Sequence, residues 1–390
     1  MKFKVARYRR RPGGPPSSSF GTRNFLFPHA LVLYGRVIDT DEQLAAVLPQ
    51  LRAADWIALD TEADSLHAYP EKLCLIQLSI PAADLLVDPL SSLNLAPILE
   101  VLGQHELVLH GADYDLRLLR KSRAFVPSGL FDTMLASRLL GDREFGLTHL
   151  VAKYLDVRLE KGPQKANWAR RPLTPRMEAY ARNDTRYLKP LADILKTQLQ
   201  EKGRLAWHQE TCARLLADCA AFRPTDPDLL WRVKGSHQLT PPALAVLREI
   251  WRWREAEAVR ANKPPYFVLP PETMIELAEA AVNGASPKQI LPRSLSPRRS
   301  EGILQAIAQG LAVENPPDVL RSRPYRQTEA EKRRMIALEK RRDVRAIQLG
   351  IDPTLIASRA MLVLLAKDWV AHEPELMRWQ RELLAAGANA

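Results

Sequence analysis

The chain has 390 residues, 46% of them hydrophobic, which is enough to bury the cores of two or three domains. A formal net charge of +11 favours a polyanionic partner, nucleic acid before an anionic membrane. Three cysteines without paired spacing exclude a disulfide framework and indicate a reducing compartment such as the cytoplasm, and the lack of an apolar run of about 18 residues excludes a membrane-spanning helix.

Residues 1–30 contain no acidic residue and are rich in Arg, Pro and Ser. They lack the apolar segment of a secretory signal. Pro12, Pro15 and Pro16 interrupt any long amphipathic helix. We expect a disordered basic tail that contacts phosphates, with an organellar transit peptide as the alternative.

From residue 34 the pattern predicts strands with interleaved helices. A short strand precedes a helix capped by Asp39 or Thr40. Apolar runs predict further strands at residues 56–62, 72–80, 84–88 and 106–111, and helical periodicity predicts helices at 95–104 and 113–122. From Phe131 onward the pattern is almost wholly helical. This order indicates an α/β domain with a mixed sheet of about five strands over residues 31–222.

Two helical regions follow, each after a Pro-rich connector. Residues 223–313 contain a long amphipathic helix and shorter helices broken by prolines, and residues 321–390 loosely repeat this order. Arginines interleave with Trp251 and Trp253, and they form either a solvated face or phosphate contacts. We expect one or two compact all-α modules behind the α/β domain.

Asp60 and Glu62 lie at the end of the predicted strand at 56–62. Residues i and i+2 of a strand point to the same face, so both carboxylates project at the carboxyl end of a buried strand, where open α/β sheets bind ligands. Two like charges this close are unfavourable unless they face water or are neutralised. The alternatives are a solvated pair at the rim and a site for Mg²⁺ or Mn²⁺.

A metal site requires further carboxylates. Asp113 and Asp115 follow another predicted strand and open a helix. Tyr180 and Asp184 lie on a later helix that Thr174 caps, with Pro175 at its first position. They are four residues apart and therefore share a face, which Leu188 continues toward the core. Taken singly, they fit a core tyrosine and an acid paired with a neighbouring arginine.

Taken together, these residues resemble the DEDD exonuclease superfamily in its tyrosine-bearing branch. Asp60-Thr61-Glu62 matches its DxE motif, His110 with Asp115 its second motif, and Tyr180 with Asp184 its YxxxD motif. Asp113 fits the second motif less well, because it is Asp115 that is followed at the expected spacing by Leu118 and Leu119. Residues 60–79 and 167–188 are most similar to ribonuclease D. Residues 247–278, with a helix, an apolar strand-like link and a second helix, are similar to its HRDC domain.

The resemblance implies a ribonuclease H-like catalytic domain followed by one or two HRDC-like domains. It implies that two divalent ions, Mg or Mn, are held directly or through water by Asp60, Glu62, Asp115 and Asp184. Asp60 would bridge both ions, Tyr180 would orient the attacking water rather than abstract its proton, and Glu62 would also bind the terminal 3′-hydroxyl.

The implied activity is metal-dependent 3′–5′ exoribonuclease action that releases nucleoside monophosphates, with RNA and in particular tRNA precursors as substrates. A DNA exonuclease and a catalytically dead RNA-binding scaffold are the alternatives. No motif implies a membrane or a protein partner. Further candidates for substrate contact, each with simple packing or local hydrogen bonding as the alternative, are Leu66, His67, Gln77, His110, Lys165, Trp168 and Arg171.

Overall fold

The computed structural model describes residues 37–221, 226–292, 295–318 and 326–385. The predicted basic tail at residues 1–30 lies outside these ranges, as do the segments that contain the predicted boundaries near residues 222 and 321. Among the described residues, no helix has the length and apolar character needed to span a bilayer.

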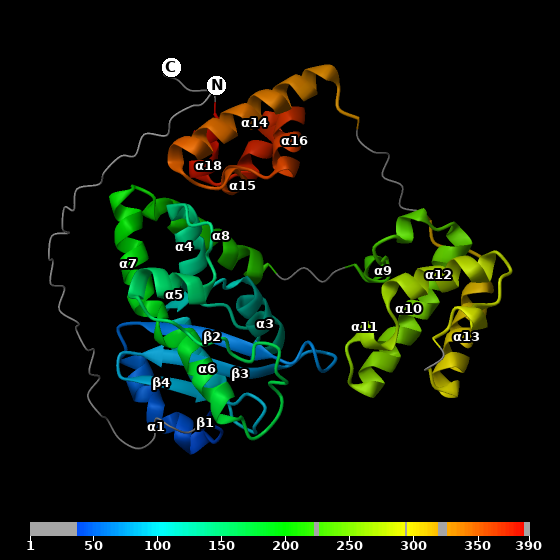
Figure 1. Ribbon diagram of the computed structural model, residues 1–390, viewed down its shortest axis with the longest axis horizontal. Helices are drawn as coiled ribbons and strands as arrows, with labels where there is room; N and C mark the ends of the chain where they lie inside the picture. Colours follow the sequence, from blue (N-terminus) through cyan, green and yellow to red (C-terminus); the bar gives the residue numbers. More distant parts are fainter. Residues whose placement is uncertain (1–36, 222–225, 293–294, 319–325, 386–390) are drawn as a thin grey trace, which may run out of the picture.

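A six-stranded mixed sheet forms the centre of the first domain, which confirms the α/β fold with a mixed sheet (Figure 1). The strand order is β1-β4-β3-β2-β5-β6, with β3 antiparallel to β2 and β4 and the other pairs parallel. The strands are β1 (Val37–Ile38), β2 (Ile57–Ala63), β3 (Leu73–Ile80), β4 (Ala83–Val87), β5 (Glu106–Leu109) and β6 (Gly129–Asp132). Strand β6 was not predicted, because four residues carry too little periodicity to distinguish a strand from the start of a helix.

Eight helices surround this sheet in the described part of the first domain. The predicted caps are present: the Thr40 hydroxyl accepts from the Gln43 N–H (3.3 Å) and the Thr174 hydroxyl from the Met177 N–H (3.2 Å). The helices are α1 (Asp41–Arg52), α2 (Ala96–Gly103), α3 (Asp113–Arg123), α4 (Thr133–Leu140), α5 (Leu147–Leu155), α6 (Pro175–Arg186), α7 (Leu188–Glu201) and α8 (Leu205–Ala220).

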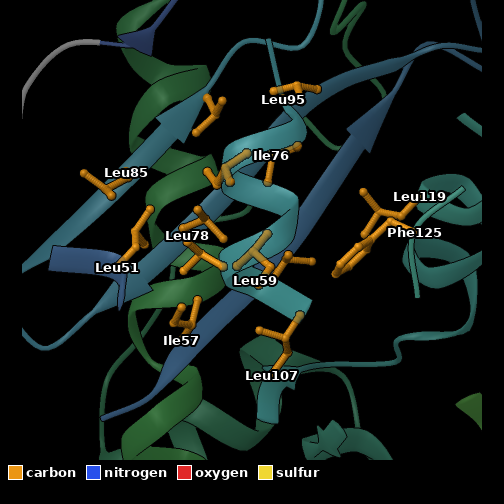
Figure 2. Packing of buried hydrophobic residues seen from close by; sticks show 14 of the residues in the cluster. Leu51, Ile57, Leu59, Ile76, Leu78, Leu85, Leu95, Leu107, Leu119 and Phe125 are labelled. Atoms are coloured by element: carbon orange, nitrogen blue, oxygen red, sulfur yellow. The ribbon is translucent and has the colours of Figure 1, made fainter. Parts of the chain in front are cut away.

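Strand alternation separates the core from the acids. Ile57 and Leu59 of β2 point to one face, where they join a large apolar cluster with residues of α1, α2, α3 and α8 (Figure 2). The other face of the sheet is covered by α6, whose Met177 and Ala181 pack against Leu75 of β3. Asp60 and Glu62 therefore project from the face of β2 that lies toward α6.

The middle helical module has a core of its own. Leu247 and Ile250 on its long helix are fully buried, on the face that the apolar spacing indicates. The apolar link expected to be strand-like instead contains the short helix α11, because Pro265 at its first position favours a helical turn. The elements are α9 (Pro227–Leu230), η1 (Ser236–Gln238), α10 (Pro241–Ala261), α11 (Pro265–Val268), α12 (Pro271–Val282), η2 (Pro287–Gln289) and α13 (Pro297–Leu311).

The last helical block packs on the first domain, against α4, α7 and α8 (Figure 1). It begins with a capping box in which Thr328 and Glu331 each accept a hydrogen bond from the other's backbone N–H. Its elements are α14 (Glu329–Leu349), α15 (Pro353–Ile356), α16 (Arg359–Lys367), α17 (Trp369–His372), η3 (Glu373–Glu375) and α18 (Arg378–Leu384). Its core residues are continuous with those of α4, α5 and α7.

Candidate active site

Three carboxylates converge where α6 crosses the end of β2. Asp60 and Glu62 come from β2 and Asp184 from α6, and each offers an oxygen atom that lies within 4.8 Å of the other two. The three side chains are half-buried. Because the Thr174 cap fixes where α6 begins, the helical repeat turns Asp184 toward the strand. The fold thus brings together acids that are more than 120 residues apart in the sequence.

Asp115 lies beside this cluster and is held by the residue between the two β2 acids. Its Oδ1 accepts hydrogen bonds from the Thr61 N–H (3.1 Å) and the Thr61 hydroxyl (2.5 Å). Asp115 is buried on the first turn of α3. Asp113, two residues earlier, is exposed and forms an ion pair with Arg117 (2.9 Å). The structure therefore places Asp115, and not Asp113, at the acidic centre.

Crowding and burial make these carboxyl groups hard to ionise. Burial, followed by the charges of Asp115, Asp184 and Glu62, raises the pKa of Asp60 well above its usual range. Burial and the charges of Asp184 and Asp115 raise the pKa of Glu62 to about 9. Burial also raises the pKa of Asp184 to about 7 and that of Asp115 to about 6. A divalent cation held by these acids would stabilise their ionised forms.

Tyr180 is on the same side of α6 as Asp184, as the spacing predicted. Its hydroxyl hydrogen-bonds to Asp184 and to Gln164. Burial and the charge of Asp184 raise the pKa of Tyr180 above its ordinary value near 10, so the phenol keeps its proton at neutral pH. The ring packs on Gly162, where an added Cβ would lie 1.5 Å from Cδ2 of Tyr180. Only glycine leaves room for the ring in this position.

A cavity of about 280 Å³ opens beside the acids. Asp60, Glu62, Asp115 and Tyr180 line it, together with residues that the sequence analysis did not assign: Ser65, Tyr114, Gln164 and Ala166. No motif marks these four positions, because they come from loops and a helix start that only the fold brings together. Gly162 is the sequence feature that could have indicated the loop carrying Gln164, because that loop passes close to the Tyr180 ring.

Comparison with known proteins agrees with this geometry. A family model for 3′–5′ exonucleases matches residues 35–200, and the HRDC domain model matches residues 243–285. The Ribonuclease D of Gluconacetobacter diazotrophicus is 31% identical over 365 residues, which cover 91% of this chain and 92% of that protein. The chain belongs to the ribonuclease D family.

Other ribonuclease D proteins and solved structures are similar over nearly the same length. The Ribonuclease D of Desulfotalea psychrophila is 29% identical and covers 89% of this chain and 96% of its own. A protein from Bifidobacterium adolescentis is 22% identical with a TM-score of 0.76, and the match covers 90% of this chain and 95% of that one. Escherichia coli RNase D is 24% identical with a TM-score of 0.70, and the match covers 90% of this chain and 96% of its own. Both structures share the fold of this chain. The chain is thus a 3′–5′ exoribonuclease that acts on nucleic acid, and its acidic cluster supports the use of divalent metal.

Three of the weaker substrate-contact candidates lie at the surface near this ribonuclease D site. Leu66 lines the cavity and is 53% exposed. His67 and Lys165 are both exposed, and Nε2 of His67 lies 3.0 Å from the backbone oxygen of Lys165. This contact joins the loop after β2 to the loop that carries Gln164.

The structure does not present the other four candidates to a substrate. Trp168 is 1% exposed in the core under α6, and Gln77 is fully buried on β3. The Arg171 guanidinium binds both carboxylate oxygens of Asp88 (2.5 and 2.7 Å) and the carbonyl of Cys74 (2.7 Å). Tertiary contacts thus occupy the surfaces of Trp168 and Arg171 that an RNA contact would need, and Gln77 is enclosed on β3.

His110 is half-buried directly after β5. Its Nδ1 lies 2.9 Å from the Thr133 hydroxyl, and burial lowers the pKa of its imidazole. A neutral, hydrogen-bonded histidine at the end of β5 fits the local structural alternative rather than contact with RNA.

Proposed function

We propose that the chain removes nucleoside monophosphates from the 3′ ends of RNA with two divalent cations, Mg²⁺ or Mn²⁺, and that tRNA precursors are its natural substrates. The convergence of Asp60, Glu62 and Asp184 within 4.8 Å carries this proposal. Membership of the ribonuclease D family and a net charge of +11 support RNA as the substrate.

The residues present fit a pair of hard cations. Asp60, Glu62 and Asp184 provide several carboxylate oxygens in one place, and such oxygens are the ligands that Mg²⁺ and Mn²⁺ prefer. Asp115, whose Oδ1 is occupied by Thr61, retains Oδ2 for a direct or water-mediated contact. When bound, two divalent cations supply a nucleophilic water at neutral pH and stabilise the charge on the leaving 3′ oxygen.

The remaining side chains orient the reactants. Tyr180, protonated and fixed by Asp184, Gln164 and the space at Gly162, orients the attacking water through its hydroxyl oxygen, because its O–H already donates to Asp184. Glu62, at the cavity wall, accepts a hydrogen bond from the terminal 3′-hydroxyl and so selects a chain end. Leu66 packs against the last base, while His67 and Lys165 contact the adjoining RNA from the cavity rim.

We also propose the division into a tail (1–30), a catalytic domain (31–222), an HRDC domain (223–313) and a second HRDC-like block (321–390). The separate core of the middle module supports its independence. We propose a cytoplasmic location, which is supported by three cysteines that are all buried and unpaired.

The test is a gel of 5′-labelled RNA incubated with wild type, Asp184→Asn and Asp113→Asn in Mg²⁺, Mn²⁺ or EDTA. We expect a one-nucleotide ladder that EDTA abolishes. Asp184→Asn should slow it by more than about 100-fold, because a direct metal ligand is lost. Asp113→Asn is the matched control, since Asp113 is an exposed acid in the same helix turn as Asp115.

Four results would contradict the proposal. A ladder that resists EDTA or Asp184→Asn would show that the chemistry occurs elsewhere. Equal degradation of a matched DNA strand would favour a DNA exonuclease, and RNA binding without any ladder would favour a scaffold. A tRNA precursor trimmed no faster than an unstructured RNA of equal length would remove the proposed substrate preference.

A further inference from the structure

Gln77 on β3 is a buried polar side chain for which the fold supplies no partner. It is 0% exposed, and neither its Nε2 nor its Oε1 has a hydrogen-bond partner. Among the residues that the structure describes, Gln77 alone has two buried side-chain atoms without a hydrogen-bond partner. Burying an unpaired amide is unfavourable, so a group in this state calls for a functional explanation.

The position of Gln77 relates it to the acids. In the antiparallel ladder Gln77 is directly opposite Asp60 of β2, so the two side chains project from the same face of adjacent strands. Its neighbours on that face of β3 lie under α6: Leu75 packs with Ala181, and the Ser79 hydroxyl lies 2.8 Å from that of Thr185. Gln77 is thus enclosed between the strand that carries Asp60 and the helix that carries Asp184.

The amide has the chemistry that this place needs. Its N–H groups are donors that carry no charge, and an ionised carboxylate is the strongest kind of acceptor for them. A neutral donor can hold a buried carboxylate without removing the negative charge that a cation requires. A lysine or arginine in the same place would compete with the cation.

We propose that Gln77 is a positioning residue for metal binding: when a cation binds and Asp60 ionises, the amide, which has no partner in the metal-free fold, donates to the Asp60 carboxylate and holds that group toward the cation. The inference rests on the proposed role of Asp60 as a metal ligand. It replaces the RNA contact that the sequence suggested for Gln77, because a fully buried side chain cannot reach a base.

The experiment compares wild type, Gln77→Met and Ser79→Ala, with Gln77→Leu as a second apolar variant. Thermal unfolding in EDTA measures the metal-free fold, and calorimetric titration with Mn²⁺ measures metal affinity. Met has nearly the shape of Gln without the amide, so Gln77→Met should unfold at the same or a higher temperature than wild type in EDTA. Its Mn²⁺ affinity should fall about 10–100-fold, as is typical for loss of a group that orients a metal ligand.

Ser79→Ala is the matched control on the same face of the same strand. It removes hydrogen bonds with Asp84 (2.6 Å) and Thr185 (2.8 Å), so it should lower the unfolding temperature and leave Mn²⁺ affinity unchanged. Mn²⁺ affinity in Gln77→Met or Gln77→Leu equal to that of wild type would overturn the inference. Failure of wild type to bind Mn²⁺, or equal binding by Asp60→Asn, would instead overturn the proposed function on which it rests.

Discussion

The two helical regions that follow the catalytic domain have similar sequence patterns but are attached to that domain in different ways. The middle module buries residues of α10, α12 and α13 in a core separate from the catalytic domain. Hydrogen bonds from Tyr69 join it to that domain, from its hydroxyl to Glu255 and from its N–H to Asn262 (3.2 Å). A few polar contacts of this kind hold a domain in place but do not determine whether it folds.

The last block, by contrast, shares its core with the catalytic domain. Trp379 of α18 stacks on Trp207 of α8 with ring centroids 4.9 Å apart, and Arg204 donates to the carbonyl of Leu349 (2.6 Å). The Arg378 N–H donates to Glu210 of α8 (2.6 Å). A similar order of helices can therefore produce either an attached module or a part of the catalytic fold. The placement of large apolar side chains decides between them.

The strongest test of this comparison removes one buried tryptophan from each region. Trp379→Ala should destabilise the last block and the catalytic domain together by about 3–5 kcal/mol, because both lose the same core contact. Trp231→Ala, equally buried at 3% exposure, should destabilise only the middle module. Differential scanning calorimetry with a trimming assay on a short RNA measures both effects. Equal loss of activity in the two variants would contradict the conclusion that the last block, and not the middle module, shares its core with the catalytic domain.

A substitution at the site separates catalytic geometry from the stability that the shared core provides. Gly162→Ala places a methyl group where the Tyr180 ring lies, so the ring must move. We expect kcat to fall by about 100-fold, the loss typical of a 1 Å misplacement, with little change in unfolding temperature. Gly146→Ala is the control, since an added Cβ there meets nothing within 4 Å. A normal kcat in Gly162→Ala would show that the position of Tyr180 is not critical.

The pH dependence of stability should have opposite signs in the two regions. Burial and neighbouring charges raise the pKa of Glu62 to about 9, so in EDTA the contribution of Glu62 to the stability of the catalytic domain is greatest below pH 4, where the unfolded chain is also protonated. That stabilisation is lost as the pH rises toward 9. For the same reason Mn²⁺ affinity should rise with pH over this range, by up to about tenfold per unit for each proton displaced.

In the middle module, burial disfavours ionisation of Glu257, but hydrogen bonds from Arg299 (2.7 Å) and Arg260 (2.9 Å) outweigh it and lower the pKa of Glu257. This contribution to stability is present at neutral pH and is lost in acid. Calorimetry in EDTA between pH 5 and 8 should therefore show only the catalytic transition moving to lower temperature as pH increases. A parallel shift of both transitions would contradict these assignments.

The smallest expected effect comes from the contact between the domains. Tyr69→Phe removes the hydrogen bond to Glu255 and should change the free energy of unfolding of either region by less than about 1.5 kcal/mol. Small-angle scattering should show a looser arrangement of the middle module. Tyr266→Phe, at an exposed tyrosine of the same module, is the control. A large fall in stability in Tyr69→Phe would show that the module is not independent.

Short-range sequence patterns account for the local features on which the site depends. Strand alternation placed Asp60 and Glu62 on one face, helical spacing placed Tyr180 and Asp184 together, and Thr174 marked the start of their helix. These features depend on periods of two and 3.6 residues and on capping chemistry, which need only a few neighbouring residues. Resemblance then identified the family before any distance was known.

Which polar residues face the cavity and which are buried depends on tertiary contacts. Gln164 and Tyr114 line the cavity, whereas Gln77 and Trp168 do not, although nothing in their local sequence distinguishes the two pairs. Tertiary contacts also decide that the last helical block completes the catalytic core. Burial and enclosure depend on contacts between residues far apart in the chain, and a local pattern carries no information about which distant side chains will pack against it.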